Sequence, residues 1–117
     1  MLTGGGDAPG LNAVIRAVVR SASLYDCACV GIEESFNGLM HPGRTLEVTL
    51  DDVVGLERIG GTILRTSNRG DPFAYPVDDL PEPKDFSSAC FETFKTLELQ
   101  AAAVGADGTV DITHKFN

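Results

Sequence analysis

Two glycine-rich turns, each with one aspartate, lie near the two ends of this 117-residue chain. The first covers residues 4–10 and contains Asp7, and the second covers residues 105–109 and contains Asp107. Glycines allow backbone N–H groups to crowd around phosphate oxygens, and a following helix directs the positive end of its dipole at the same anion. A carboxylate in such a turn does not suit bare phosphate, but it suits a hydrated Mg²⁺ that bridges phosphates. The two turns therefore predict a site for a phosphate ligand with bound magnesium.

Strands and helices must hold these turns in place, and the hydrophobic pattern predicts where they lie. Apolar residues recur at helical spacing from Pro9 to about Ser23, with Asp7 as a candidate N-cap. The pattern predicts the remaining elements in this order: strands over 27–32 and 46–50, a short helix over 51–59, a brief strand over 62–64, a helix over 86–97, a strand over 101–104, and a last helix after the Asp107 turn.

This alternation of helices and strands predicts an α/β fold of Rossmann-like type, with three layers and a mainly parallel sheet. The two glycine turns should be neighbours at the carboxyl edge of that sheet. Only Met1, Leu2 and Thr3 precede the first turn, where a strand of about five apolar residues is typical, and the last helix would have about two turns. We therefore expect a fragment that is incomplete at both ends and belongs to a larger domain.

Composition narrows the function classes. The chain has 9 Lys and Arg against 17 Asp and Glu, a net charge of −8, which argues against a nucleic-acid partner or an acidic membrane surface. Any phosphate site must then be locally basic. No apolar run approaches the roughly 20 residues of a membrane span, and no charged and apolar leader is visible, so we expect a cytoplasmic protein. The three cysteines, Cys27, Cys29 and Cys90, are expected to be buried structural thiols.

Four sequence blocks together strongly resemble the N-terminal part of 6-phosphofructokinases. They are TGGGDAPGLNA at 3–13, GGTIL at 60–64, TSNRGDPF at 66–73 and GADGT at 105–109. The resemblance covers nearly the whole chain and implies that residues 1–117 are the N-terminal part of a nucleotide-binding domain. It also implies a glycolytic kinase that moves a phosphoryl group from ATP, or from pyrophosphate, to the 1-hydroxyl of fructose 6-phosphate. At full length we expect a homo-oligomer.

The resemblance also assigns roles to individual positions. Asp107 would hold Mg²⁺, and Phe36 would be the aromatic residue beside the nucleotide. The positions that match the family's nucleotide-binding residues are Gly5, Phe36, Arg69, Gly70, Gly105, Gly108 and Thr109. Glycine at 108 favours ATP, because pyrophosphate users commonly place an aspartate there. The family's catalytic aspartate segment and its sugar-phosphate arginines would lie beyond Asn117, so these residues alone should not turn over substrate.

Several positions leave alternatives open. Arg65 and Ala106 stand where the family has glycine, which favours a non-catalytic paralogue or subunit as an alternative; a pyrophosphate-dependent enzyme is another. A large side chain at Arg65 would need either a tolerant backbone angle or a rebuilt loop. Arg16 and Arg20 match effector-binding positions of bacterial ATP-using members, although the alternative that we favour is a solvated helix face. Asp7 could be only a helix cap.

Overall fold

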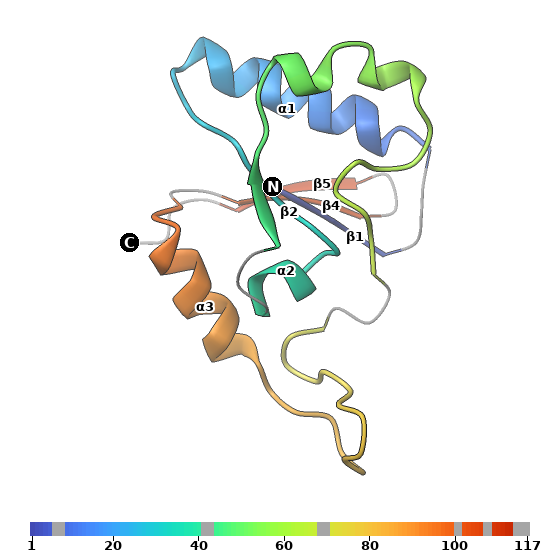
Figure 1. Ribbon diagram of the computed structural model, residues 1–117, viewed down its shortest axis with the longest axis vertical. Helices are drawn as coiled ribbons and strands as arrows, with labels where there is room; N and C mark the ends of the chain where they lie inside the picture. Colours follow the sequence, from blue (N-terminus) through green and yellow to red (C-terminus); the bar gives the residue numbers. More distant parts are fainter. Residues whose placement is uncertain (6–8, 41–43, 68–70, 100–101, 107–108, 114–117) are drawn as a thin grey trace.

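The structure, a computed structural model, describes residues 1–5, 9–40, 44–67, 71–99, 102–106 and 109–113, the last two ranges as backbone only (Figure 1). Within these residues a five-stranded sheet has the order β3-β2-β1-β4-β5. The strands are β1 (Leu2–Gly4), β2 (Val30–Ile32), β3 (Thr45–Glu47), β4 (Ala102–Ala106) and β5 (Thr109–Thr113). The first turn is thus preceded by a short strand, whereas we expected none.

The centre of the sheet is parallel and its edges are antiparallel. Strand β1 pairs in parallel with β2, with Leu2 opposite Ile32, and with β4, with Gly4 opposite Ala106. Strand β3 runs antiparallel to β2, and β5 runs antiparallel to β4. The parallel centre with helices on both faces confirms the predicted α/β class, as an incomplete fragment with a mixed sheet.

Helical segments cover the two faces of the sheet and make three layers (Figure 1). On one face lie α1 (Leu11–Leu24) and the short 3₁₀ turns η1 (Asp51–Val53) and η2 (Leu56–Arg58). On the other face lie α2 (Asn37–Met40) and α3 (Ser87–Thr96). Each face has its own core. The first contains Ile15, Val19, Val48, Val53, Leu56 and Leu64, and the second contains Leu2, Ile32, Leu39, Met40 and Cys90.

Helix α1 begins at Leu11, two residues later than predicted. Gly10 is its N-cap, with φ 92° and ψ −1°, a left-handed conformation that glycine adopts without a steric penalty. The Gly10 carbonyl accepts the first intrahelical hydrogen bond from the Val14 N–H at 3.0 Å. Asp7, the predicted cap, lies outside the described residues. The far end of the helix, Leu24, agrees with the prediction.

Two other predicted elements are different in the structure. The helix expected after the Asp107 turn is wrong, because residues 109–113 form strand β5. Their sequence, Thr-Val-Asp-Ile-Thr, is rich in β-branched residues, which favour strands, and Thr109 pairs directly with Ala106. The short helix over 51–59 is split into η1 and η2, because Gly55 between them has φ 71°.

The predicted strand over 62–64 is also absent from the described sheet, and these residues form a turn that the Arg65 N–H closes by donating to the Thr62 carbonyl at 3.2 Å. The strand predicted at 27–32 begins only at Val30, and the strand predicted at 46–50 is observed at 45–47. Local sequence therefore located most elements but not their ends.

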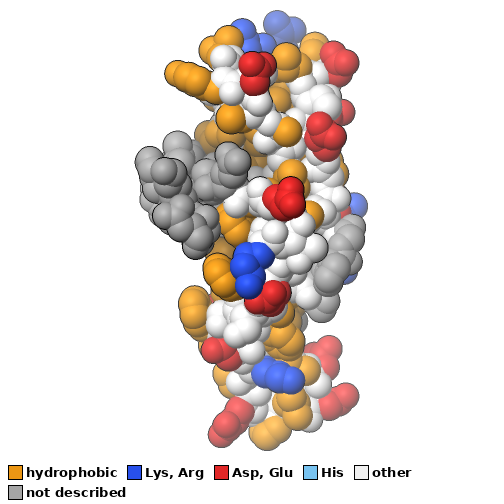
Figure 2. All heavy atoms as spheres, turned by 90° about the vertical axis from the view of Figure 1, so that its left-hand side faces the viewer, with side chains coloured by type: hydrophobic (Ala, Val, Ile, Leu, Met, Phe, Trp, Pro, Cys, Tyr) orange, Lys and Arg blue, Asp and Glu red, His pale blue; other side chains and the backbone are white. Residues whose placement is uncertain are grey.

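The surface has scattered charges with exposed apolar side chains between them. Figure 2 shows acidic side chains distributed over one face with fewer basic ones, as the net charge requires. Leu24, Tyr25 and Val54 are the most exposed large apolar residues described, at 83%, 79% and 77%. Cys27 is exposed, which corrects the prediction of a buried thiol there, whereas Cys90 is buried. In the described part of the chain, no helix has the length and apolar character needed to cross a membrane.

Candidate functional site

The two glycine turns start from adjacent strands. Because β1 and β4 are parallel and Gly4 is opposite Ala106, both strands end at the same edge of the sheet. The ends of β1 and β4 are therefore neighbours, as predicted for the two turns. Gly5 comes directly after β1 and has φ 77°, a left-handed angle that favours glycine. Asp107 and Gly108 lie outside the described residues, and Thr109 begins β5.

Gly105 and Ala106 are the last two residues of β4, opposite Thr3 and Gly4 respectively. The structure describes their backbone and pairing, which place them at the strand end where the sequence predicts the second turn. The roles assigned to Gly105, Gly108, Thr109 and Asp107 remain predictions.

A buried asparagine on α1 holds the loop that follows η2. Asn12 is 2% exposed, and its amide nitrogen Nδ2 donates to the Ile59 carbonyl at 2.9 Å and to the Gly60 carbonyl at 3.3 Å. Its Oδ1 accepts a hydrogen bond from the Ile63 N–H at 2.9 Å. Since a buried amide is stable only when hydrogen-bonded, Asn12 fixes this loop against the start of α1. Sequence reasoning missed this role, although a lone asparagine on the apolar face of the helix was a usable signal.

Hydroxyl groups attach the next part of the same loop to the end of β1. Thr3 is 3% exposed, and its hydroxyl donates to the Arg65 carbonyl at 2.7 Å. The Thr62 hydroxyl lies 3.0 Å from that of Thr3 and is the donor of the pair, because the single hydroxyl proton of Thr3 is already used. The Thr66 hydroxyl donates to the Gly5 carbonyl. Residues 62–66 therefore lie directly against the first glycine turn.

Arg65 stands in this loop with a left-handed backbone. Its φ is 59°, in the left-handed region that favours glycine and that an L-residue occupies only at a conformational cost. The tolerant backbone angle that the sequence left open for this arginine is therefore not observed. The Arg65 side chain is 70% exposed.

Phe36 lies beyond a sharp turn that follows β2. Two residues of this turn, Glu34 and Ser35, have φ 57° and 62°. Ser35 is buried, and a Cβ built on Gly4 would lie 2.9 Å from its Oγ, so the turn closely approaches the end of β1. Phe36 itself is half-buried and packs against the second core, which gives part of its ring a structural role.

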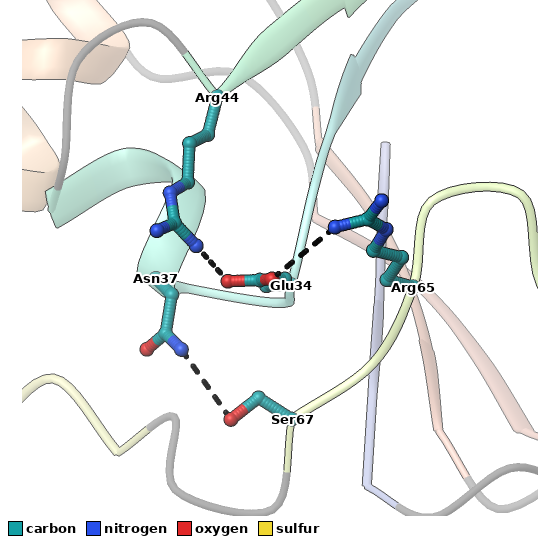
Figure 3. Close-up of polar contacts among 5 residues, drawn as sticks. All are labelled: Glu34, Asn37, Arg44, Arg65 and Ser67. Atoms are coloured by element: carbon teal, nitrogen blue, oxygen red, sulfur yellow. Dashed lines mark hydrogen bonds and ion pairs between the residues drawn. The ribbon is translucent and has the colours of Figure 1, made fainter.

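One carboxylate in this turn interacts with two arginines from different segments (Figure 3). Glu34 Oε2 forms an ion pair with Arg44 Nη1, and Glu34 Oε1 lies 3.7 Å from Arg65 Nη1. Nearby, Asn37 Nδ2 donates to Ser67 Oγ at 3.4 Å. The two guanidinium groups share one carboxylate, and a second acidic residue, Glu33, precedes it in the same turn.

The remaining predicted site residues are only partly placed. Arg69 and Gly70 lie outside the described residues. Arg16 Nε forms an ion pair with Glu57 Oε2 at 3.0 Å, which ties α1 to η2, and Arg20 is exposed on α1. Among the described residues no group of three or more His, Cys, Asp or Glu could hold a metal ion.

Comparison with known proteins gives a consistent result. The family model described as phosphofructokinase matches residues 1–117. An ATP-dependent 6-phosphofructokinase of Chloroflexus aggregans is 44% identical over 110 residues, which are 93% of this chain and 31% of that protein. A pyrophosphate–fructose 6-phosphate 1-phosphotransferase of Dictyoglomus thermophilum is 37% identical over 118 residues, with 31% of its own length covered. The chain thus spans about a third of these relatives.

The fold agrees with a solved structure as well. The T-state structure of Pichia pastoris phosphofructokinase has a TM-score of 0.72 and 29% identity, over 88% of this chain and 10% of that one.

Proposed function

The chain belongs to the phosphofructokinase family, and we propose that it supplies the nucleotide- and magnesium-binding part of an ATP-dependent 6-phosphofructokinase. The complete protein would transfer the γ-phosphoryl of ATP to the 1-hydroxyl of fructose 6-phosphate, and would act as a homo-oligomer. The observation that carries this proposal is the parallel register of β1 and β4, which ends the strands before both glycine turns at one edge of the sheet.

In this proposal the backbone does most of the phosphate binding. Gly5, with its left-handed angle and no side chain, leaves room for the donor's phosphate chain to approach. Gly105, Gly108 and Thr109 would line the opposite side of the same site. Arg69 and Gly70 would contact the nucleotide, and the exposed part of Phe36 would stack on the base. These are the parts that phosphoryl transfer requires, because its catalysis is mostly positioning and neutralisation of charge.

Asp107 is the residue that would hold the metal. An anionic oxygen in the turn after β4 suits Mg²⁺, which takes oxygen ligands and keeps several waters. When bound, Mg²⁺ supplies positive charge to the phosphate oxygens. Asp107 would fix its position relative to the backbone groups that follow β1. The base that activates the sugar hydroxyl and the groups that bind the sugar phosphate are proposed to lie in the part of the protein beyond these residues.

The relative from Dictyoglomus thermophilum favours a second candidate, a pyrophosphate-dependent enzyme. Gly108 supports ATP over pyrophosphate, since a small residue leaves space for the α-phosphate of a nucleotide. The third candidate, a non-catalytic paralogue, depended on Arg65 and Ala106. Arg65 has a left-handed φ of 59°, which favours glycine, so this substitution is held at a conformational cost and the candidate stays open.

The test is a comparison of phosphoryl donors with a full-length protein that contains these residues. Rates are measured with Mg-ATP and with Mg-pyrophosphate at saturating fructose 6-phosphate. Faster transfer from ATP supports the proposal, and faster transfer from pyrophosphate contradicts the choice of donor. If neither donor reacts and neither binds in calorimetry, the chain is part of a non-catalytic protein.

A further inference from the structure

Three separate segments meet at the Glu34 carboxylate. Glu34 lies in the turn after β2, Arg44 lies just before β3, and Arg65 lies in the loop that contacts the first glycine turn (Figure 3). Backbone hydrogen bonds join the same segments, since the Glu34 N–H donates to the Leu64 carbonyl and the Glu33 N–H to the Arg44 carbonyl, each at 2.9 Å. The side-chain and backbone contacts together connect the Phe36 turn to the 62–66 loop.

The backbone at this junction is costly to maintain. Glu34, Ser35 and Arg65 all have left-handed φ angles between 57° and 62°, which L-residues adopt only at a conformational cost. Such angles persist only where surrounding contacts determine them. The two ion pairs of Glu34 are such contacts, and its side chain is only 27% exposed.

The two arginines contribute differently. Arg44 is in direct contact with Glu34, whereas the Arg65 guanidinium is 3.7 Å away and its side chain is 70% exposed. An exposed pair of this kind contributes little to global stability. The position of Arg65 matters more. Its carbonyl accepts a hydrogen bond from the Thr3 hydroxyl, and the hydroxyl of the next residue, Thr66, donates to the Gly5 carbonyl. A shift of Arg65 would therefore be transmitted to the end of β1.

We propose that Glu34 is a positioning residue for nucleotide binding: its carboxylate, shared between Arg44 and Arg65, sets the Phe36 turn at a fixed place relative to the loop that contacts Gly5. The aromatic ring would contact the base and Gly5 the phosphates, so the Glu34 bridge fixes the separation of the two ends of the nucleotide site. This inference rests on the proposed function for its ligand. The bridge itself is independent of any ligand.

The test uses the full-length protein with Glu34→Gln, Arg65→Ala and the double variant. In Glu34→Gln the KM for ATP should rise about three- to tenfold, the range expected for loss of a partly exposed charge interaction. The kcat and the KM for fructose 6-phosphate should stay within twofold of the parent values, because the proposal gives Glu34 no contact with the sugar or with the transferred phosphoryl group. Since both single changes break the same contact, the double variant should be no worse than Glu34→Gln.

Two further variants serve as controls. Glu47→Gln removes the same charge from an exposed position on β3, where no ion pair joins it to a described residue, and should leave the KM for ATP unchanged. Arg65→Lys keeps a cation near Glu34 and should stay within twofold of the parent, because a 3.7 Å charge contact does not need the planar arginine group.

Hydrogen exchange separates failure of this inference from failure of the proposed function. In Glu34→Gln, peptides covering 34–40 and 62–67 should exchange faster than in the parent, whether or not ATP is a substrate. Unchanged exchange together with an unchanged KM for ATP would overturn the positioning role. If the parent protein does not use ATP but exchange still rises, the bridge stands and the choice of ligand is wrong.

Discussion

Replacing Arg65 by glycine and by alanine tests the backbone angle at this position separately from the contacts of its side chain. Both changes remove the guanidinium and its 3.7 Å contact with Glu34, so the loss of that ion pair cancels when the two variants are compared. The difference between them then depends on the φ of 59° and on the greater freedom of glycine in the unfolded chain.

The expected difference follows from two opposing terms. A left-handed angle costs an L-residue about 1–2 kcal/mol, and alanine pays this cost whereas glycine does not. Glycine in turn loses about 0.5–1 kcal/mol through its greater freedom in the unfolded chain. Arg65→Gly should therefore be more stable than Arg65→Ala by about 1 kcal/mol or slightly less. At an ordinary negative φ the order of the two variants would be reversed.

The assay is urea unfolding of the full-length protein, in which the shift of the midpoint multiplied by the measured slope gives the difference in the free energy of unfolding. A matched pair at Arg20 provides the control. That residue is exposed in the middle of α1, where alanine should be more stable than glycine by about 1 kcal/mol. If alanine is also the more stable residue at 65, the left-handed angle is wrong, and the account of how the loop accommodates an arginine fails with it.

Three other predictions concern single side chains. Asn12→Leu should cost roughly 2–4 kcal/mol in urea unfolding, because it leaves the Ile63 N–H and the Ile59 carbonyl without their partner; a cost below about 1 kcal/mol would contradict the anchoring role. Asp107→Asn should change stability by less than about 1 kcal/mol but lower phosphoryl transfer by orders of magnitude, and full activity or loss of the fold would each refute its assignment to Mg²⁺. The pKa of Asp52 is held below its usual value by hydrogen bonds from the Thr49 N–H and hydroxyl. Its stabilising effect is therefore present above the unfolded-state pKa and lost as the pH falls through the folded-state pKa; Thr49→Val should raise that pKa in an NMR titration, and no change would remove the hydroxyl as a cause.

The sequence predicted the parts of this fold that depend on local pattern. The presence of α1 and its far end followed from apolar residues at helical spacing, although its start did not, and α3 was predicted within a residue at each end. The prediction that the two glycine turns are neighbours followed from the logic of parallel sheets, and the ends of β1 and β4 lie side by side as it requires. These features need only short-range information and a general rule of topology.

The features that were missed depend on contacts between distant residues. Asn12 holds a loop 47 to 51 positions away, and nothing around it in the sequence specifies that partner. Strand β5 was mistaken for a helix because a glycine turn after a strand usually opens one in this kind of fold. The β-branched residues between Thr109 and Thr113 are the local feature that favours a strand over a helix here.

Arg65 shows where a departure from the expected residue is informative. The sequence could identify it only as an arginine in place of glycine, with two possible consequences for the loop. In the structure Arg65 has a left-handed angle that favours glycine, and two more left-handed residues of the described part, Glu34 and Ser35, lie in the turn that contacts it. Three non-glycine residues thus have left-handed backbone angles at one junction, beside the end of β1 and away from the regular helices.

Such concentrations of backbone strain are expected at functional sites, where surrounding contacts compensate for them. The shared Glu34 carboxylate is the contact that could do so here, which is why its removal should disturb nucleotide binding before it disturbs the fold.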